Sequence, residues 1–282
     1  MSTAVLFDAP GPATRLRHLV YTIVTVVVLV ALVAFAVVKL AADDQFTGDK
    51  WEVFTTPDYV RILLVDGLLQ TLKMAGAAVV GAVVLGFFLG VGKLSDHAVV
   101  RWPCWAFVEL FRALPVLLLM VFTWYLLGIA NDASSFRAVV IALMLYNGSV
   151  LAEVLRAGVL AVPRGQAEAA YALGMRKSQV MTIVLMPQAV KIMLPALISQ
   201  CVVALKDTAL GQYVAAPGLT FVSRQIYTEF SNRVPSVFVV AAIYIVINLL
   251  LTALATWVQR RYVGERKQLE VLATGTADQT TI

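Results

Sequence analysis

The sequence predicts an all-α membrane protein with six transmembrane helices. Of the 282 residues, 60% are hydrophobic and only 14% are charged, and the mean hydropathy is +0.85. Soluble globular domains are about a quarter charged and about half apolar, so this composition excludes a soluble fold. Several apolar runs reach the roughly 20 residues that a helix needs to cross a bilayer. Because hydrocarbon offers the backbone no hydrogen-bond partners, each run is predicted to be a helix.

The first predicted helix spans residues 19–38 and follows the polar N-terminal tail over 1–18. Its apolar stretch is much longer than the 7–15 residues of a typical signal-peptide core, so we interpret it as a membrane anchor. The next segment, 41–59, is rich in Asp and Glu, and we expect it to be irregular.

Five further transmembrane helices are predicted over 65–91, 105–127, 136–159, 192–209 and 237–258. An exposed segment that contains Pro217 and Pro235 joins the last two. The tail over 259–282 is first basic and then polar, and we expect it to be disordered beyond Ala273. The glycines at the end of helix 65–91, Gly86 and Gly90, predict close packing against another helix.

The distribution of Lys and Arg predicts the orientation of the chain. With six helices, one side of the membrane carries both tails, the loop over 93–104 and the loop over 162–187. That side collects more Lys and Arg than the other, and cytoplasmic loops carry such an excess. Both termini and the loop over 162–187 are therefore predicted to be cytoplasmic, within reach of an intracellular partner.

Polar residues inside the predicted helices are candidates for a substrate pathway, because a charge within the bilayer costs a few kcal/mol or more. Lys73 lies two residues after Thr71; it either snorkels or pairs with Asp66, or it faces the pathway and meets a substrate carboxylate. Asn147 is a further candidate in the middle of helix 136–159.

Two charged pairs stand near the ends of predicted helices. Glu153 and Arg156 share a helix face, and we favour mutual neutralisation near the cytoplasmic boundary over ligand binding. Lys206 and Asp207 are adjacent and so point in different directions. They either pair with other helices or serve as a gate or substrate contact.

The sequence predicts neither a catalytic nor a metal site. It contains no Ser-His-Asp set, no paired carboxylates on one face and no metal-ligand cluster. The segment 90–93 lacks the spacing of a phosphate-binding loop, so we expect no nucleotide site in this chain. No nucleic-acid-binding motif accompanies the formal charge of +5.

The loop over 162–187 interrupts the apolar sequence with small and polar residues. Pro163 is placed to start a helix, and Gly174 to end it as the residue after the C-cap. Ser178 is predicted to cap a second short helix that Pro187 limits. The first helix carries Ala167, Ala169, Ala170 and Ala172 around Glu168, a face that fits closely against another protein; the alternative is an ordinary surface helix.

The run of Glu168, Ala169 and Ala170, followed by Gly174 and later by Met186-Pro187, resembles the EAA loop of ABC-importer permeases. The segments 67–72, 111–117, 152–158, 165–170 and 206–210 are similar, in the same order, to the polar amino acid (His/Glu/Gln/Arg/opine) branch of that family. The resemblance implies a five-helix permease core within 65–258, preceded by an extra helix. It also implies an ATPase-coupling helix whose contact residues are Gly165, Gln166, Glu168, Ala169, Ala170 and Gly174.

The resemblance implies the transmembrane subunit of an ATP-driven importer of polar amino acids in a prokaryotic plasma membrane. Its expected partners are ATPase subunits that hold ATP and Mg, a second permease of the same or another chain, and an extracellular solute-binding protein. No cofactor is expected in this chain. Lys73 and the general excess of cations favour an acidic substrate such as glutamate.

Two other classes remain open from the residues. A secondary transporter predicts an inverted repeat with helices broken at matching places, and we find neither in the sequence. A membrane-embedded enzyme needs clustered acid–base or metal-binding residues, which the sequence does not display.

Overall fold

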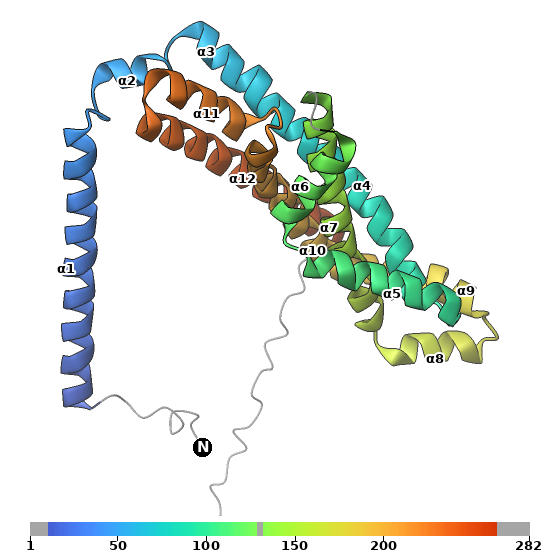
Figure 1. Cartoon of the computed structure of the whole chain (residues 1–282). Helices are drawn as coiled ribbons and strands as arrows, with labels where there is room; N and C mark the ends of the chain where they lie inside the picture. Colours follow the sequence, from blue (N-terminus) through green and yellow to red (C-terminus); the bar gives the residue numbers. More distant parts are fainter. Residues whose placement is uncertain (1–10, 129–131, 264–282) are drawn as a thin grey trace, which may run out of the picture.

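The computed structural model describes residues 11–128 and 132–263, which form helices joined by short connections (Figure 1). The predicted all-α class is confirmed. Within these described residues, five helices are long and apolar enough to cross a membrane, or up to six if one sharply bent pair counts as a single span. The predicted disorder beyond Ala273 lies outside the described residues.

The extra N-terminal helix exists and is longer than predicted. Helix α1 spans Pro12–Ala42 and stands away from the rest of the bundle in Figure 1. None of its most apolar 18-residue window is buried within the chain. An apolar helix without protein neighbours is suited to lipid contact, which agrees with a membrane anchor.

The expectation of an irregular segment over 41–59 is wrong, because two short helices form there. They are α2, Gly48–Glu52, and α3, Pro57–Ile62. Each has an Asp in its first turn, where a carboxylate interacts favourably with the helix dipole, and Pro57 suits the first turn of α3. The acidic residues that suggested irregular structure therefore favour these helix starts.

Hydrogen bonds attach α2 to the corner between α11, Leu219–Phe230, and α12, Arg233–Val263. The Lys50 ammonium donates to the Phe230 carbonyl over 3.1 Å. The Asn232 side-chain amide donates to the Lys50 carbonyl over 3.1 Å, and its oxygen accepts the Ser236 hydroxyl. These contacts join the N-terminal extension to the bundle.

Replacing Asn232 by alanine should therefore destabilise the protein by about 1–3 kcal/mol, because Asn232 is fully buried and its partners lose their hydrogen bonds. Thermal unfolding of the purified permease measures this loss. The matched control is Asn248→Ala, whose side-chain amide donates only to the carbonyl one turn earlier in its own helix. Equal melting temperatures for the two variants would show that the α2 attachment contributes nothing.

The central pair of helices is α4, Gln70–Lys93, and α7, Asp132–Leu160. Helix α3 continues into α4 through a π-helical turn, η2, Leu63–Leu69, so that one apolar span runs from Pro57 to Lys93. The predicted close packing of Gly86 and Gly90 is confirmed. A Cβ at Gly86 would lie only 2.7 Å from the Leu151 Cβ on α7.

The helix predicted over 105–127 is broken, so the prediction of one continuous helix there is wrong. Helix α5, Ala98–Ala113, and helix α6, Val116–Leu127, meet at an angle of 105°. The bend falls at Leu114 and Pro115. Proline disfavours a helical conformation in the preceding residue, and Leu114 is extended, with φ −79° and ψ 134°.

The chain between α7 and α12 also differs from expectation. Helix α8, Arg164–Ala172, is followed by α9, Lys177–Gln179, a π-helical turn η3, Val180–Leu185, and α10, Met186–Asp207. Pro187 lies in the first turn of α10 and does not end a separate helix, because proline is tolerated there. Arg176, not Ser178, is the N-cap of α9.

The segment predicted to be exposed around Pro217 and Pro235 contains η4, Thr208–Val214, and α11. Leu219, Val222 and Ile226 are buried on α11, so this expectation is wrong. The apolar residues repeat at helical spacing and pack with Leu63 and Val240 in one cluster.

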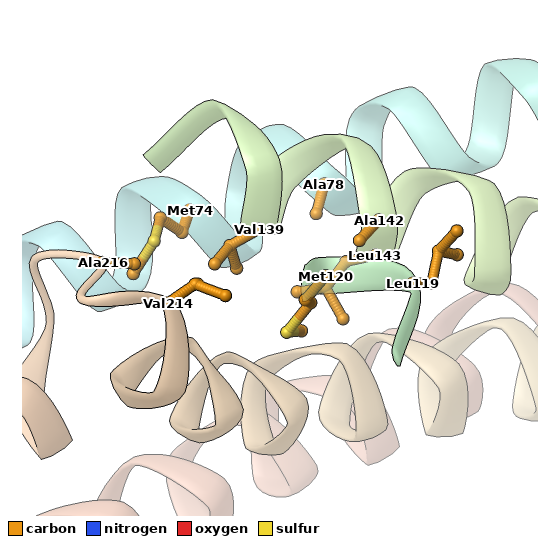
Figure 2. Close-up of a cluster of buried hydrophobic side chains, with 9 residues drawn as sticks. All are labelled: Met74, Ala78, Leu119, Met120, Val139, Ala142, Leu143, Val214 and Ala216. Atoms are coloured by element: carbon orange, nitrogen blue, oxygen red, sulfur yellow. The ribbon is translucent and has the colours of Figure 1, made fainter. Parts of the chain in front are cut away.

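The main core lies where α4, α6, α7 and η4 meet (Figure 2). In the close-up, the Met74 side chain on α4 extends toward Ala216, and Met120 on α6 lies beside Leu143 on α7. The remaining buried members of the cluster are Ala78, Leu119, Ala142, Val214 and Ala216. The core thus fixes the bent α5–α6 pair and η4 against the central helices, and so shapes the cavities described next.

Candidate functional site

The loop over residues 162–187, predicted to couple the chain to an ATPase and called the coupling loop below, projects from one end of the bundle, with α8 at its tip (Figure 1). Gly174 has a φ of +76° and ends α8 as predicted. The Gly174 N–H donates to the Tyr171 carbonyl over 2.9 Å, and the Met175 N–H donates to the Ala170 carbonyl over 3.2 Å. This is the double hydrogen bond of a Schellman motif, which favours glycine at the left-handed position.

The alanines of α8 do not form one outward face. Ala170 is buried and Ala167 is half-buried, whereas Ala169 and Ala172 are exposed. Helical spacing explains this difference in exposure, because residues three positions apart lie on the same side of a helix. Ala167 and Ala170 therefore share the inner side, and Ala169 and Ala172 share the outer side. The outward surface of α8 therefore combines the exposed alanines with Glu168 and with Leu173, whose exposure is 83%.

The coupling loop is attached to the bundle at several points. The Gln188 side chain on α10 donates to the Gln166 side-chain oxygen over 3.3 Å. Lys177 forms an ion pair with Asp96 in the connection between α4 and α5, and its hydrogen bond lowers the pKa of the Asp96 carboxyl. Beneath the loop, Val159, Val162 and Ala189 form a small buried cluster. The loop is therefore linked to α10 through α8 and to the connection between α4 and α5 through α9.

Glu153 and Arg156 belong to a charged cluster of five residues on three helices. The Glu153 carboxylate accepts the Arg156 Nε–H over 3.0 Å and also pairs with Lys93. Glu109 lies 3.5 Å from both Lys93 and Arg112. The Glu153–Arg156 ion pair is thus present in the structure. Sequence reasoning missed Lys93, although its place at the end of an apolar span was a signal.

A cavity of about 530 Å³ lies at the bend between α5 and α6. Arg112 reaches it from α5, and Gln200 and Asp207 from α10. The other lining residues are Ala113, Leu114, Pro115, Val116, Tyr146, Val150 and Val203. We call this open space the bend cavity; it brings one cation, one carboxylate and one amide together beside mostly apolar residues.

Asn147 lies behind this cavity rather than in it. The residue is 1% exposed, and its side-chain oxygen accepts the Gln200 amide over 2.6 Å. Its own amide donates to the Leu143 carbonyl over 2.9 Å. Asn147 therefore orients Gln200, which lines the bend cavity.

Lys206 points elsewhere, as expected for a residue adjacent to Asp207. It lines a second cavity of about 550 Å³ between α10 and α12, together with Tyr244, Asn248 and Thr252. No ion pair within 4.0 Å involves Lys206 or Asp207 in the part of the chain that the structure describes.

Thr71 and Lys73 line neither of these two cavities. Thr71 is buried, donates to the Gly67 carbonyl and accepts the Leu219 N–H over 2.8 Å, so it connects α4 to the start of α11. Lys73 is exposed on α4, away from the cavities described above, and over residues 11–128 it forms no ion pair with Asp66. The role of Lys73 in a substrate pathway stays a prediction.

Comparison with known proteins agrees with this architecture. The profile of the family described as "Binding-protein-dependent transport system inner membrane component" matches residues 82–264. The glutamate transport system permease protein GluD of Corynebacterium glutamicum is 42% identical over 238 residues, which cover 83% of this chain and 87% of GluD. The glutamate/aspartate import permease protein GltK of Escherichia coli is 33% identical over 210 residues, which cover 70% of this chain and 92% of GltK.

Solved structures show the same relation. A chain from a crystal structure of an amino acid ABC transporter with histidines has a TM-score of 0.68 and 31% identity, over 74% of this chain and 98% of that chain. A chain of the inward-facing MetNI methionine ABC transporter has a TM-score of 0.63 and 23% identity, which shows the shared fold. The resemblance found in the sequence is confirmed, and the chain belongs to the family of inner membrane components of binding-protein-dependent transport systems.

Proposed function

We propose that this chain is the membrane-spanning subunit of an ATP-driven importer of polar amino acids, with glutamate as its first substrate. The observation that carries the proposal is α8, an exposed helix that ends in a Schellman motif. Gln166 on α8 is hydrogen-bonded to Gln188 on α10, and Lys177 on the next helix, α9, pairs with Asp96 in the connection between α4 and α5. The identity of 42% to a glutamate permease supports the choice of substrate.

Coupling follows from the way α8 is held. ATPase subunits on the cytoplasmic side would contact the outward residues of α8, of which Glu168 and Leu173 are the most distinctive. Their movement would carry α8 as a rigid body and shift α10 relative to α7. Two packings of these helices, each favoured by different partners, would then open the chain to opposite sides of the membrane.

The bend cavity suits an amino acid zwitterion. Arg112 offers a cation for a carboxylate, Asp207 offers an anion for the ammonium group, and Gln200 offers both a donor and an acceptor. Its volume of about 530 Å³ falls in the range of ligand sites, roughly 300–1,000 Å³. Within this proposal, the bend cavity is a binding site for the amino acid along the substrate pathway.

The remaining partners complete the proposed assembly. A second permease would lie beside this one, and a solute-binding protein would deliver the amino acid from outside. The excess of Lys and Arg at the α8 end supports a cytoplasmic location for that end and for both termini. Labelling of a cysteine placed at Leu173 from either side of the membrane tests this orientation.

Uptake by the assembled transporter tests the function. Proteoliposomes that contain this permease and its ATPase and binding-protein partners should accumulate labelled glutamate when ATP is enclosed. Unlabelled aspartate and glutamine compete in proportion to their affinity, and arginine should compete least. Asp207→Asn should reduce uptake at least tenfold, whereas Glu229→Gln, an equivalent change on the exposed side of α11, should leave it unaltered. Arginine uptake that exceeds glutamate uptake would contradict the substrate assignment.

A further inference from the structure

We propose that a basic cavity at the α8 end of the bundle binds the phosphate of an anionic phospholipid headgroup. The cavity has a volume of about 470 Å³ and lies between the end of α4, the length of α5 and the last turns of α7. Its lining residues are Lys93, Arg101, Trp102, Trp105, Glu109, Arg112, Glu153 and Arg156. We call it the basic cavity.

Positive charge exceeds negative charge in this cavity. Lys93, Arg101, Arg112 and Arg156 line it, against two carboxylates. Both carboxylates already form ion pairs with cations of the lining. Glu109 pairs with Lys93 and Arg112, and Glu153 pairs with Lys93 and Arg156. The charge balance of the lining therefore leaves two cations without a counter-ion of their own, which a phosphodiester monoanion would help to neutralise.

Arginine donors remain available for this anion. The Arg156 guanidinium contributes its Nε–H to Glu153, and a guanidinium has five N–H donors in all. Arg101 donates only to the carbonyls of Ser95 and Asp96, at 3.4 and 3.5 Å, which are long distances for hydrogen bonds. Arg101 is exposed, so its side chain can turn toward a bound phosphate with little loss.

Two tryptophans place the cavity at a membrane surface. Trp102 and Trp105 are adjacent on α5, with ring centroids 5.5 Å apart, and their exposures are 60% and 46%. Tryptophan is enriched at the level of lipid headgroups, where an apolar ring and a polar N–H both find partners. Val99, on the same helix, is 87% exposed and offers an apolar surface to an acyl chain.

The position along the bundle agrees with a headgroup. Lys93 is the last residue of α4 and ends an apolar span of 37 residues that begins at Pro57. A cation buried at such a boundary lies near the depth of lipid phosphates. Basic pockets between membrane helices bind the headgroups of anionic lipids in other proteins. Because α5 is amphipathic and turns by 105° into α6, it presents both the basic cavity and the apolar flank to the same lipid.

Lipid titration of the purified permease with its ATPase subunits in detergent tests the proposal. Native mass spectrometry counts the phosphatidylglycerol molecules retained, and the melting temperature is followed with phosphatidylglycerol, phosphatidylcholine and inorganic phosphate in turn. Phosphatidylglycerol should be retained and raise the melting temperature more than either of the other two. Arg101→Gln should weaken phosphatidylglycerol binding by about fivefold, since one cation near a membrane surface contributes on that order.

The matched control is Lys191→Gln, which removes an exposed cation from α10 outside the cavity lining and should leave binding unchanged. Equal stabilisation by phosphatidylcholine, or equal losses in the two variants, would overturn the proposal. An equal response to inorganic phosphate would assign the site to a free anion, and displacement of phosphatidylglycerol by glutamate would assign it to the transport pathway. The assay measures binding without uptake, and Arg101 does not line the bend cavity, so a negative result here leaves the proposed function standing.

Discussion

Gly174→Asp should abolish ATP-driven uptake while the permease still inserts into the membrane. Gly174 has a φ of +76°, and its N–H and that of Met175 close the end of α8. A side chain in this left-handed conformation costs about 1–2 kcal/mol. Aspartate also places a negative charge at the C-terminal end of a helix, where the dipole is already negative. The turn that fixes the direction of α8 is therefore lost.

Glu168→Lys should give the same result by a different route, because it reverses the charge on the exposed surface of α8 without changing its backbone. We expect a loss of uptake of at least a hundredfold for either variant. Membrane insertion, the melting temperature of the permease and co-purification of the ATPase subunits are measured in parallel. Glu168→Lys should lower ATPase retention with the melting temperature unchanged.

Gly48→Asp and Glu229→Lys are the matched controls for these two variants. No atom lies within 4 Å of a Cβ added at Gly48, so a side chain fits there. Glu229 is exposed on α11, which is far from the coupling loop in the sequence. Both should retain uptake. Normal uptake by Gly174→Asp and Glu168→Lys would mean that α8 is not the contact through which ATP hydrolysis moves the permease.

The sequence predicts most of this fold because a bilayer leaves few choices. Long apolar runs must be helices in hydrocarbon, so the predicted ends of α1, α4, α7 and α12 all lie within seven residues of the observed ends. The bend at Leu114 was missed because hydropathy is continuous across it. Pro115 was the available signal, since proline limits the conformation of the preceding residue.

The candidate sites were less predictable, because their residues come together only through helix packing. Gly174 was identified from local chemistry, and the structure gives it the expected backbone conformation. The pairing of Lys93 with Glu153, by contrast, joins residues 60 positions apart and leaves no periodic trace in the sequence. The same holds for Gln200, which was not predicted as a site residue and which Asn147 orients across two helices.

The break between α5 and α6 also bears on the alternative of a secondary transporter, for which broken helices at matching places in two halves were expected. The second half has no equivalent bend among the described residues. Its two apolar helical stretches, Lys177–Val214 and Arg233–Arg261, are each a single candidate membrane span. Membership in the family of inner membrane components accounts for the chain without that alternative.

Gly86→Ala should destabilise the permease by about 1–3 kcal/mol, the usual cost of inserting a methyl group into a tightly packed contact. The added Cβ would lie 2.7 Å from the Leu151 Cβ and 2.8 Å from the Gly148 carbonyl oxygen. Both atoms are fixed to the α7 backbone, so no side-chain rotation relieves the overlap. Helices α4 and α7 must therefore move apart. This movement loosens the main core, which includes Met74 on α4 and Leu143 on α7.

Gly76→Ala on the same helix is the matched control, because no atom lies within 4 Å of a Cβ at that position. Alanine there should stabilise α4 by about 0.5–1 kcal/mol through its higher helix propensity. Unfolding of the two variants in mixed micelles with increasing denaturing detergent measures the difference, which should reach about 2 kcal/mol or more. If the two variants unfold together, the close approach of α4 and α7 does not hold this bundle together, and the cavities beside it require another support. If they separate as expected, the small-residue face of α4 sets the distance between α4 and α7, which both contribute residues to the basic cavity.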